Sequence, residues 1–208
     1  MRYLIFLLTL ALIGAGCSSN NKAATPQNSS SSAQPTGSSA AETSAGSNAA
    51  SADKDQSFVQ DAIKGNRAEV TLGKMVAAKT KDPSVKQFAQ LMVKDHTQAL
   101  SQLTQLAQQK SITVPEGLPE DAQQLQNKLQ SETGRQFDKD YMDGMVKDHQ
   151  KDVQEFQDQA QNAQDPEVKQ LAAKLVPTLQ EHLDKAQKVD DKVNSGRTAA
   201  SSSGGASE

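Results

Sequence analysis

Asp82-Pro-Ser-Val-Lys-Gln-Phe-Ala89 and Asp165-Pro-Glu-Val-Lys-Gln-Leu-Ala172 are two copies of one pattern, and they decide the fold. In each copy, the aspartate is suited to cap a helix and the proline to occupy the first helical position. Amphipathic patterns with a period of 3.6 residues lie on both sides of each copy. Each copy therefore predicts the turn of an antiparallel helical hairpin, and the chain contains two related hairpins.

The segment between the hairpins is too long for a simple turn. It runs from Gln109 to Thr133 and contains a Pro- and Gly-rich stretch followed by a short predicted helix, 120–129. Two hairpins joined by such a crossover predict an all-α, ferritin-like four-helix bundle with a long crossover connection. The predicted first and second main helices cover about 55–79 and 84–109, the third carries Phe137 to Phe156, and the fourth carries Val168 to Val189. Pro177 is expected to kink the fourth helix.

The N-terminal residues predict export and lipid attachment. Met1 and Arg2 precede an apolar run of about a dozen residues, too short to span a bilayer, and small residues follow before Cys17. Cys17 is the only cysteine, and the site resembles a bacterial lipobox, although Gly14 stands where Leu is commoner. The alternative is an ordinary secretory signal with an incidental cysteine. We expect anchorage through lipidated Cys17, in the outer membrane facing the periplasm if the host has two membranes and otherwise on the outer face of the cell membrane.

Composition divides the rest of the chain. Residues 17–54 and 195–208 are rich in Ser, Ala, Gly and Thr and have almost no large apolar side chain, so they are expected to be a disordered tether and tail. Residues 1–16 form the predicted signal peptide and 55–194 the predicted bundle domain. The formal net charge is −3 and the charges are interspersed, which predicts no nucleic-acid partner. No common catalytic motif and no activated nucleophile is recognisable, so an enzyme that works without a metal is the least favoured class.

The chain has three histidines, and two of them end copies of Met-Val-Lys-Asp-His, at 92–96 and 145–149. The third is His182. On helical wheels these histidines lie near the apolar stripes of their helices, and so do Glu69 and Asp152. Reflection across the two turns places Glu69 level with His96 and His149 level with His182. The predicted site is therefore a buried polar cluster of Glu69, His96, His149, Asp152 and His182, with Asp95 and Asp148 at its flanks, where they would bond histidines and fix their tautomers.

Five strings in the chain are specific enough to resemble a known family. They are Phe58-Val-Gln-Asp-Ala-Ile63, Glu69-Val-Thr-Leu-Gly-Lys74, Phe88-Ala-Gln-Leu-Met-Val-Lys-Asp-His96, Phe137-Asp-Lys-Asp-Tyr-Met-Asp-Gly-Met-Val-Lys-Asp-His149 and Leu175-Val-Pro-Thr-Leu-Gln-Glu-His-Leu183. Over about 57–186 the chain resembles the bacterial family called domain of unknown function 4142. The resemblance implies a ferritin-like helical bundle in a secreted or lipid-anchored envelope protein. It implies no particular activity.

Three functions stay open at this point. Imidazole and carboxylate at one level of a bundle suit Fe, Mn, Zn or Cu, and Met92 and Met145, one turn before two of the histidines, would add soft ligands for copper. The chain lacks the Glu-x-x-His pairs of di-iron bundles, and His149-x-x-Asp152 only reverses that spacing. Alternatively, the cluster is a satisfied polar core, or the domain is a protein-interaction module that presents its Gln- and Lys-rich faces.

Overall fold

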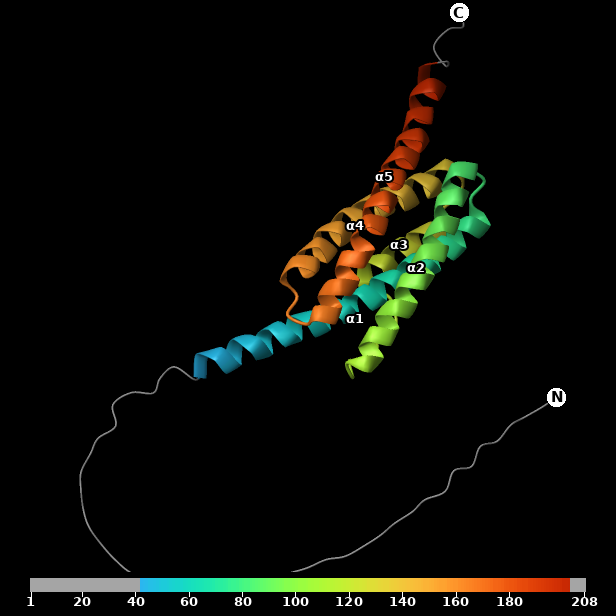
Figure 1. Cartoon of the computed structure of the whole chain (residues 1–208). Coiled ribbons are helices and arrows are strands. Elements are labelled where there is room, and N and C mark those ends of the chain that lie inside the picture. The colour runs from blue at the N-terminus through green and yellow to red at the C-terminus, as the bar shows by residue number, and fades with distance from the viewer. Residues whose placement is uncertain (1–41, 203–208) are drawn as a thin grey trace, which may run out of the picture. The chain divides into compact units, whose positions relative to one another are not determined.

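The computed structural model describes residues 42–202, with side chains for 53–195, and this part of the chain contains helices and no strand. Figure 1 shows the helices running side by side, with their ends joined by short turns and one longer connection. The five helices are α1 (Glu42–Lys79), α2 (Pro83–Gln109), α3 (Glu120–Ser131), α4 (Gly134–Asn162) and α5 (Pro166–Ser202). None of these helices is both long and apolar enough to cross a membrane. The predicted signal peptide and Cys17 lie outside the described residues.

The two predicted hairpins are present. α1 packs along α2, and α4 packs along α5. At the first turn, Oδ1 of Asp82 accepts hydrogen bonds from the backbone N–H groups of Ser84 and Val85, at 2.7 and 3.1 Å. At the second turn, Oδ1 of Asp165 accepts from the N–H groups of residues 167 and 168, at 2.9 and 3.2 Å. The all-α bundle with a crossover is therefore confirmed, together with the capping role of both aspartates.

The crossover holds the predicted short helix, which appears as α3. α3 packs against α4. Two basic side chains of α1 fasten this connection: Nη1 of Arg67 donates to the carbonyl of Pro115 at 2.6 Å, and Nζ of Lys79 donates to the carbonyl of Leu129 at 2.7 Å. The crossover is thus tied to the first hairpin at both of its ends.

Two helices extend beyond the predicted bounds of the bundle domain. α1 begins at Glu42, within the segment predicted to be a disordered tether, and α5 continues to Ser202, within the predicted tail. Apolar periodicity marks only the part of a helix that packs against neighbours, so it cannot detect an extension rich in Ala and Ser. These extensions contain no proline that would end the helix. α5 also continues through Pro177.

The core consists of two apolar clusters with a polar level between them. Each of the four long helices contributes to both clusters. The first cluster includes Val59, Ile63, Leu103, Phe156 and Leu175, and the second includes Leu72, Phe88, Met92, Phe137 and Tyr141. The helices pass from one cluster to the other at buried polar residues, namely Asn66, Glu69, His96, His149 and His182. The packing of the bundle therefore brings polar side chains of four helices to one level.

Candidate metal centre

The three histidines meet at this polar level, and together they are called the histidine centre below. His96 comes from α2, His149 from α4 and His182 from α5, and each is at most 2% exposed. Their ring centroids are 5.2 to 5.5 Å apart. One possible ligand atom from each residue lies within 4.8 Å of the other two. Three imidazoles from three helices therefore face one another in the interior.

Each imidazole uses one ring nitrogen for a hydrogen bond to an acceptor. Nδ1 of His96 lies 2.9 Å from Oδ1 of Asn66, on α1. Nδ1 of His149 lies 2.9 Å from the backbone carbonyl of Met145, one turn earlier on α4. Nε2 of His182 lies 3.1 Å from Oδ2 of Asp95, on α2. Because these partners are oxygen acceptors, the ring nitrogen in each pair carries the proton, which assigns the tautomer of each neutral ring.

The opposite nitrogen of each ring has no partner within the described structure. These atoms are Nε2 of His96, Nε2 of His149 and Nδ1 of His182, and all three are buried. In a neutral imidazole, the nitrogen opposite the N–H carries a lone pair and accepts. Buried polar atoms are nearly always paired in folded proteins, so three unpaired acceptors at one place need an explanation.

Electrostatics keep the three rings neutral near pH 7. Burial lowers the pKa of His96 well below its ordinary range, and the neighbouring His149 and His182 lower it further. Burial and His182 lower the pKa of His149 to about 4. Burial also lowers the pKa of His182, and the hydrogen bond that this ring donates to Asp95 only partly opposes the effect. The lone pairs are therefore available at neutral pH without the loss of a proton.

A metal cation satisfies this arrangement better than a water molecule does. One water has two hydrogens to donate, so it can serve two of the three acceptors and leaves the third unpaired. A cation accepts all three lone pairs. At metal–nitrogen distances of about 2.0 to 2.1 Å, three ligands around one ion lie roughly 3.5 Å apart. The possible ligand atoms of the histidine centre, which lie within 4.8 Å of one another, are somewhat farther apart than that spacing.

The structure does not bring the two predicted carboxylates into this group. Oε1 of Glu69 lies 3.7 Å from Nδ1 of His149, which is the nitrogen bonded to the Met145 carbonyl and not the free one. Asp152, one turn after His149, lines a cavity together with Glu69. The predicted five-residue set is thus divided into three converging histidines and two carboxyls that face a separate space.

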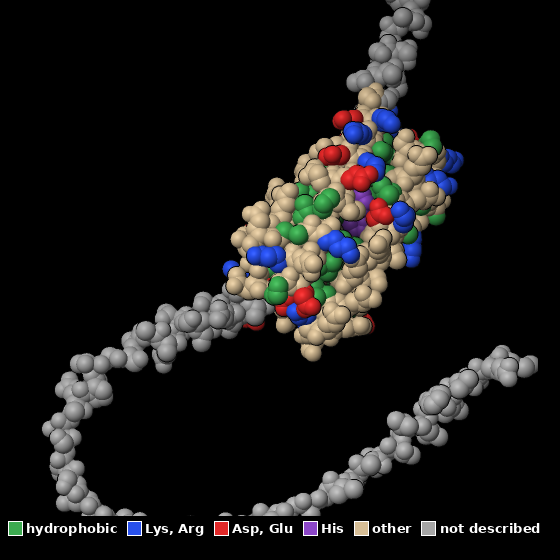
Figure 2. Space-filling view, viewed as in Figure 1, with side chains coloured by type: hydrophobic (Ala, Val, Ile, Leu, Met, Phe, Trp, Pro, Cys, Tyr) green, Lys and Arg blue, Asp and Glu red, His purple; other side chains and the backbone are tan. Residues whose placement is uncertain are grey.

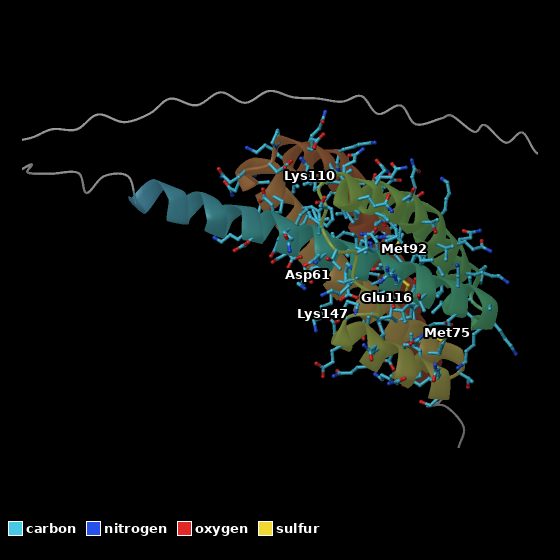
Figure 3. The ribbon with its side chains drawn as sticks, turned by 90° about the horizontal axis from the view of Figure 1, so that it is seen from below. Asp61, Met75, Met92, Lys110, Glu116 and Lys147 are labelled. Carbon is cyan, nitrogen blue, oxygen red and sulfur yellow. The ribbon has the colours of Figure 1, made fainter. Side chains whose placement is uncertain are left out.

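This separate space is a cavity of about 280 Å³, called the acidic cavity below, with walls from α1, α3 and α4. The pKa of Glu69 is raised well above its ordinary value, chiefly by burial and then by the charges of Asp148 and Asp152. Burial is also the main cause that raises the pKa of Asp148 to about 6 and that of Asp152 to about 7. Figure 3 labels Asp61, which lines the cavity. The carboxyls that line it are Asp61, Glu69, Asp121, Asp148, Asp152 and Glu155.

The two flanking aspartates differ from each other. Asp95 bonds His182, which is the kind of contact that the sequence predicts. Asp148 bonds no histidine, because its side chain faces the acidic cavity while His149 bonds the backbone of its own helix. The sequence reasoning also missed Asn66, the partner of His96. Asn66 lies three residues before Glu69, on the same helical face, and that spacing was the available signal.

A second cavity, of about 210 Å³, reaches the histidine centre from the side of α2 and α5. His96, His182 and Asp95 line it, together with Lys174 and Thr178. Figure 2 shows histidine atoms on this face, with acidic and basic side chains around them. Asn66 lines this cavity and the acidic cavity alike. The histidine centre therefore borders a cavity on this side of the bundle.

The two methionines that precede histidines are fully buried. Met92, labelled in Figure 3, and Met145 belong to the second apolar cluster, together with Leu72, Phe88 and Tyr141. Thioethers commonly fill such cores. Core packing in this cluster therefore accounts for the burial of both methionines, and a role as metal ligands is not needed to explain it.

The family resemblance is borne out by a comparison with family models. The model described as "Domain of unknown function (DUF4142)" matches residues 40–189. The chain therefore belongs to the DUF4142 family. A comparison with curated proteins gives no match.

Solved structures with the same fold include proteins of two kinds. The crystal structure of a DUF305 protein from Streptomyces coelicolor, described as secreted, superposes with a TM-score of 0.59 at 15% identity, over 67% of this chain and 93% of that one. CopM in its Cu(II)-bound form gives 0.57 at 18% identity, over 66% of this chain and 96% of the other. CopM in its Ag-bound form superposes with a TM-score of 0.53 at 20% identity, over 64% of this chain and 93% of the other. At these identities, the likeness establishes a shared fold.

Proposed function

We propose that this member of the DUF4142 family is a copper-binding protein of the bacterial cell envelope, which holds the ion at the histidine centre. One observation carries the proposal. Three buried imidazoles each have one nitrogen fixed as a donor and the other free as an acceptor, and the rings lie against one another. A metal ion is the ligand that satisfies three such acceptors together.

The donor set favours copper among the metals that imidazole binds. Imidazole suits Zn, Cu, Fe and Ni, and among divalent ions the affinity for a given site peaks at Cu(II). The three rings are neutral and add no negative charge, so the monovalent Cu(I) ion costs less to bury than a divalent ion. CopM, which has the same fold, was solved with Cu(II) and with Ag bound, and this supports the choice.

Metal binding is tested by titrating the full chain with Cu(I), Cu(II), Ag(I) and Zn(II) in turn, against a chelator of known affinity. We expect about one copper per chain and a rise in melting temperature, because a ligand that binds only the native state stabilises it by mass action. His96→Ala, His149→Ala and His182→Ala should each remove the copper-dependent rise. Gln150→Ala is the matched control, since Gln150 is exposed and adjacent to His149.

The alternative is a polar core in a structural or protein-interaction module, and the same experiment separates it. In a polar core, each histidine substitution lowers the melting temperature equally with copper and with chelator. A wild-type melting temperature that no metal changes would contradict the copper site and favour this alternative.

We further propose that lipid on Cys17 anchors the protein and that the segment after it holds the bundle away from the membrane. The apolar run, the small residues before Cys17 and the absence of any other cysteine support this. Cys17→Ser should release the protein from the membrane fraction. A variant that still sediments with membranes would show that the anchor lies elsewhere.

A further inference from the structure

The acidic cavity has more carboxyl groups than partners for them. Among its six carboxyls, Asp61 pairs with Lys64 at 2.7 Å, and Glu155 pairs with Lys151 at 3.6 Å. Oδ1 of Asp121 accepts from the N–H of Ala122. The side chains of Asp148 and Asp152 form no hydrogen bond or ion pair within residues 53–195. Lys147 and Lys151 attract Asp148, and Lys151 also attracts Asp152, but neither lysine forms a hydrogen bond or ion pair with these two carboxyls.

Glu69 supplies an independent sign that the cavity holds a ligand. This side chain is only 4% exposed, it lines the cavity, and its Oε2 has no hydrogen-bond partner. Its other oxygen lies 3.7 Å from Nδ1 of His149, beyond hydrogen-bond distance, and that nitrogen already donates to the carbonyl of Met145. A carboxylate buried to this degree and left unpaired is expensive unless a cation or a donor reaches it.

We propose that the acidic cavity is a second cation site, distinct from the histidine centre, which takes a hard divalent ion such as Ca²⁺ or Mn²⁺ through the carboxylates of Glu69, Asp148 and Asp152. Hard cations prefer oxygen ligands and commonly retain several waters. A cavity of about 280 Å³ has room for an ion with part of its water shell. The ion balances the charge of three carboxyls that line one cavity, among which Glu69 is buried and has no partner for its Oε2.

The single tyrosine of the bundle domain offers a specific readout. Tyr141 is buried, and Glu69 is close enough to raise its pKa, after the larger effect of burial. Tb³⁺ is a hard ion that stands in for Ca²⁺, and it emits when a nearby tyrosine transfers excitation to it. The chain has two tyrosines and no tryptophan. In the full chain with Tyr3→Phe, emission excited through tyrosine therefore reports on Tb³⁺ near Tyr141.

The experiment is a titration of this protein with Tb³⁺, followed by displacement with Ca²⁺ and Mn²⁺. We expect saturable emission that excess Ca²⁺ or Mn²⁺ removes. Asp148→Asn and Asp152→Asn should each weaken Tb³⁺ binding at least about tenfold. The matched control is Asp158→Asn, because Asp158 is an exposed carboxylate of the same helix outside this cavity, and its affinity should stay within about twofold of the parent. Far-UV circular dichroism checks folding, which both cavity variants should retain because each removes a charge that burial disfavours.

Absence of tyrosine-excited emission, or full affinity in the Asp148→Asn/Asp152→Asn double variant, would overturn the second site. The copper proposal is judged separately by His182→Ala, which should lose copper and keep Tb³⁺ binding. A chain that binds Tb³⁺ in the cavity and binds no copper would support the second site and contradict the copper centre. A chain that binds copper and no Tb³⁺ would support the copper centre and contradict the second site.

Discussion

The two hairpins contain the same pentapeptide, Met-Val-Lys-Asp-His, and they use it differently. In both copies the histidine points to the polar level and the methionine into the second apolar cluster. The acceptor differs, since His96 bonds the side chain of Asn66 from α1 and His149 bonds the backbone of its own helix. The aspartates differ as well, since Asp95 bonds His182 and Asp148 lines the acidic cavity.

The sequences after the two histidines diverge, and this divergence separates the two candidate sites. Three residues on, the first hairpin has Ala99, which joins the first apolar cluster, and the second hairpin has Asp152, which joins the acidic cavity. The shared pentapeptide therefore fixes the position of the histidines, while the residues around each copy decide the chemistry nearby. Substitutions at corresponding positions of the two hairpins test this division.

The largest effect is expected at Asp152, the position with no acidic counterpart in the first hairpin. The pKa of Asp152 is raised from 3.8 to about 7, mainly by burial. Well below pH 3.8 the carboxyl is protonated in both states. Between about pH 3.8 and 7 the unfolded chain has lost its proton and the folded chain has not, so the free energy of unfolding falls as pH rises. Asp152→Asn removes this loss. With chelator present, the variant should equal wild type near pH 3 and exceed its unfolding free energy by roughly 2 to 4 kcal/mol at pH 8.

Urea unfolding at both pH values measures this difference, and Asp158→Asn serves as the exposed control on the same helix. If Asp152→Asn did not raise the free energy of unfolding at pH 8, the charge of the carboxylate would be compensated in the folded state. The proposed difference between Ala99 and Asp152 would then be contradicted.

The two pentapeptide aspartates should have unequal effects on copper binding. Asp95 accepts from His182 and orients that ring, and the loss of such a partner commonly lowers metal affinity by roughly 10- to 100-fold. Asp95→Asn should therefore weaken copper binding by about that factor. Asp148→Asn, in the matching position of the other copy, should leave copper affinity nearly unchanged, because Asp148 bonds no histidine. Competition with a copper chelator measures both, and equal losses would show that the hairpins are not differentiated in this way.

Asn66 tests the difference between the two histidine acceptors. Asn66→Leu removes the partner of Nδ1 of His96 and leaves a buried donor unpaired, which should lower the free energy of unfolding by about 1 to 3 kcal/mol. His149 has no such vulnerable partner, because a backbone carbonyl serves it. Asn127→Leu, at an exposed position of α3, is the control. Similar melting of Asn66→Leu and wild type would mean that His96 finds another acceptor.

These contacts mark the limit of what the sequence predicts. The repeated Asp-Pro pattern and the helical period predict both hairpins, and reflection across the turns predicts that His149 and His182 meet. Helical wheels give the direction of a side chain only to within a broad sector, so they could not separate Glu69 and Asp152 from the histidines or assign Asn66 to His96. The cavities arise from the packing of three or more helices, and the extensions of α1 and α5 lack an apolar stripe, so periodicity detects neither.

The smallest effect is expected at the repeated turns. Asp82→Ala and Asp165→Ala each remove a helix cap and should cost about 1 kcal/mol of unfolding free energy. Asp165→Ala should cost a few tenths of a kcal/mol more, because Lys110 lies 2.6 Å from its Oδ2 in a partly exposed ion pair. Asn at either position keeps a capping oxygen, so Asp82→Asn and Asp165→Asn should lower the free energy of unfolding only slightly. Chemical denaturation compares the four variants, and an equal loss for Asn and Ala would contradict a capping role.

X-ray absorption spectroscopy of the copper-loaded full chain tests the central claim most directly. We predict about one copper per chain, with three imidazole nitrogens in its first coordination sphere, and loss of one imidazole or of the metal in His182→Ala. A copper ion bound without imidazole, or a spectrum that His182→Ala leaves unchanged, would contradict the account.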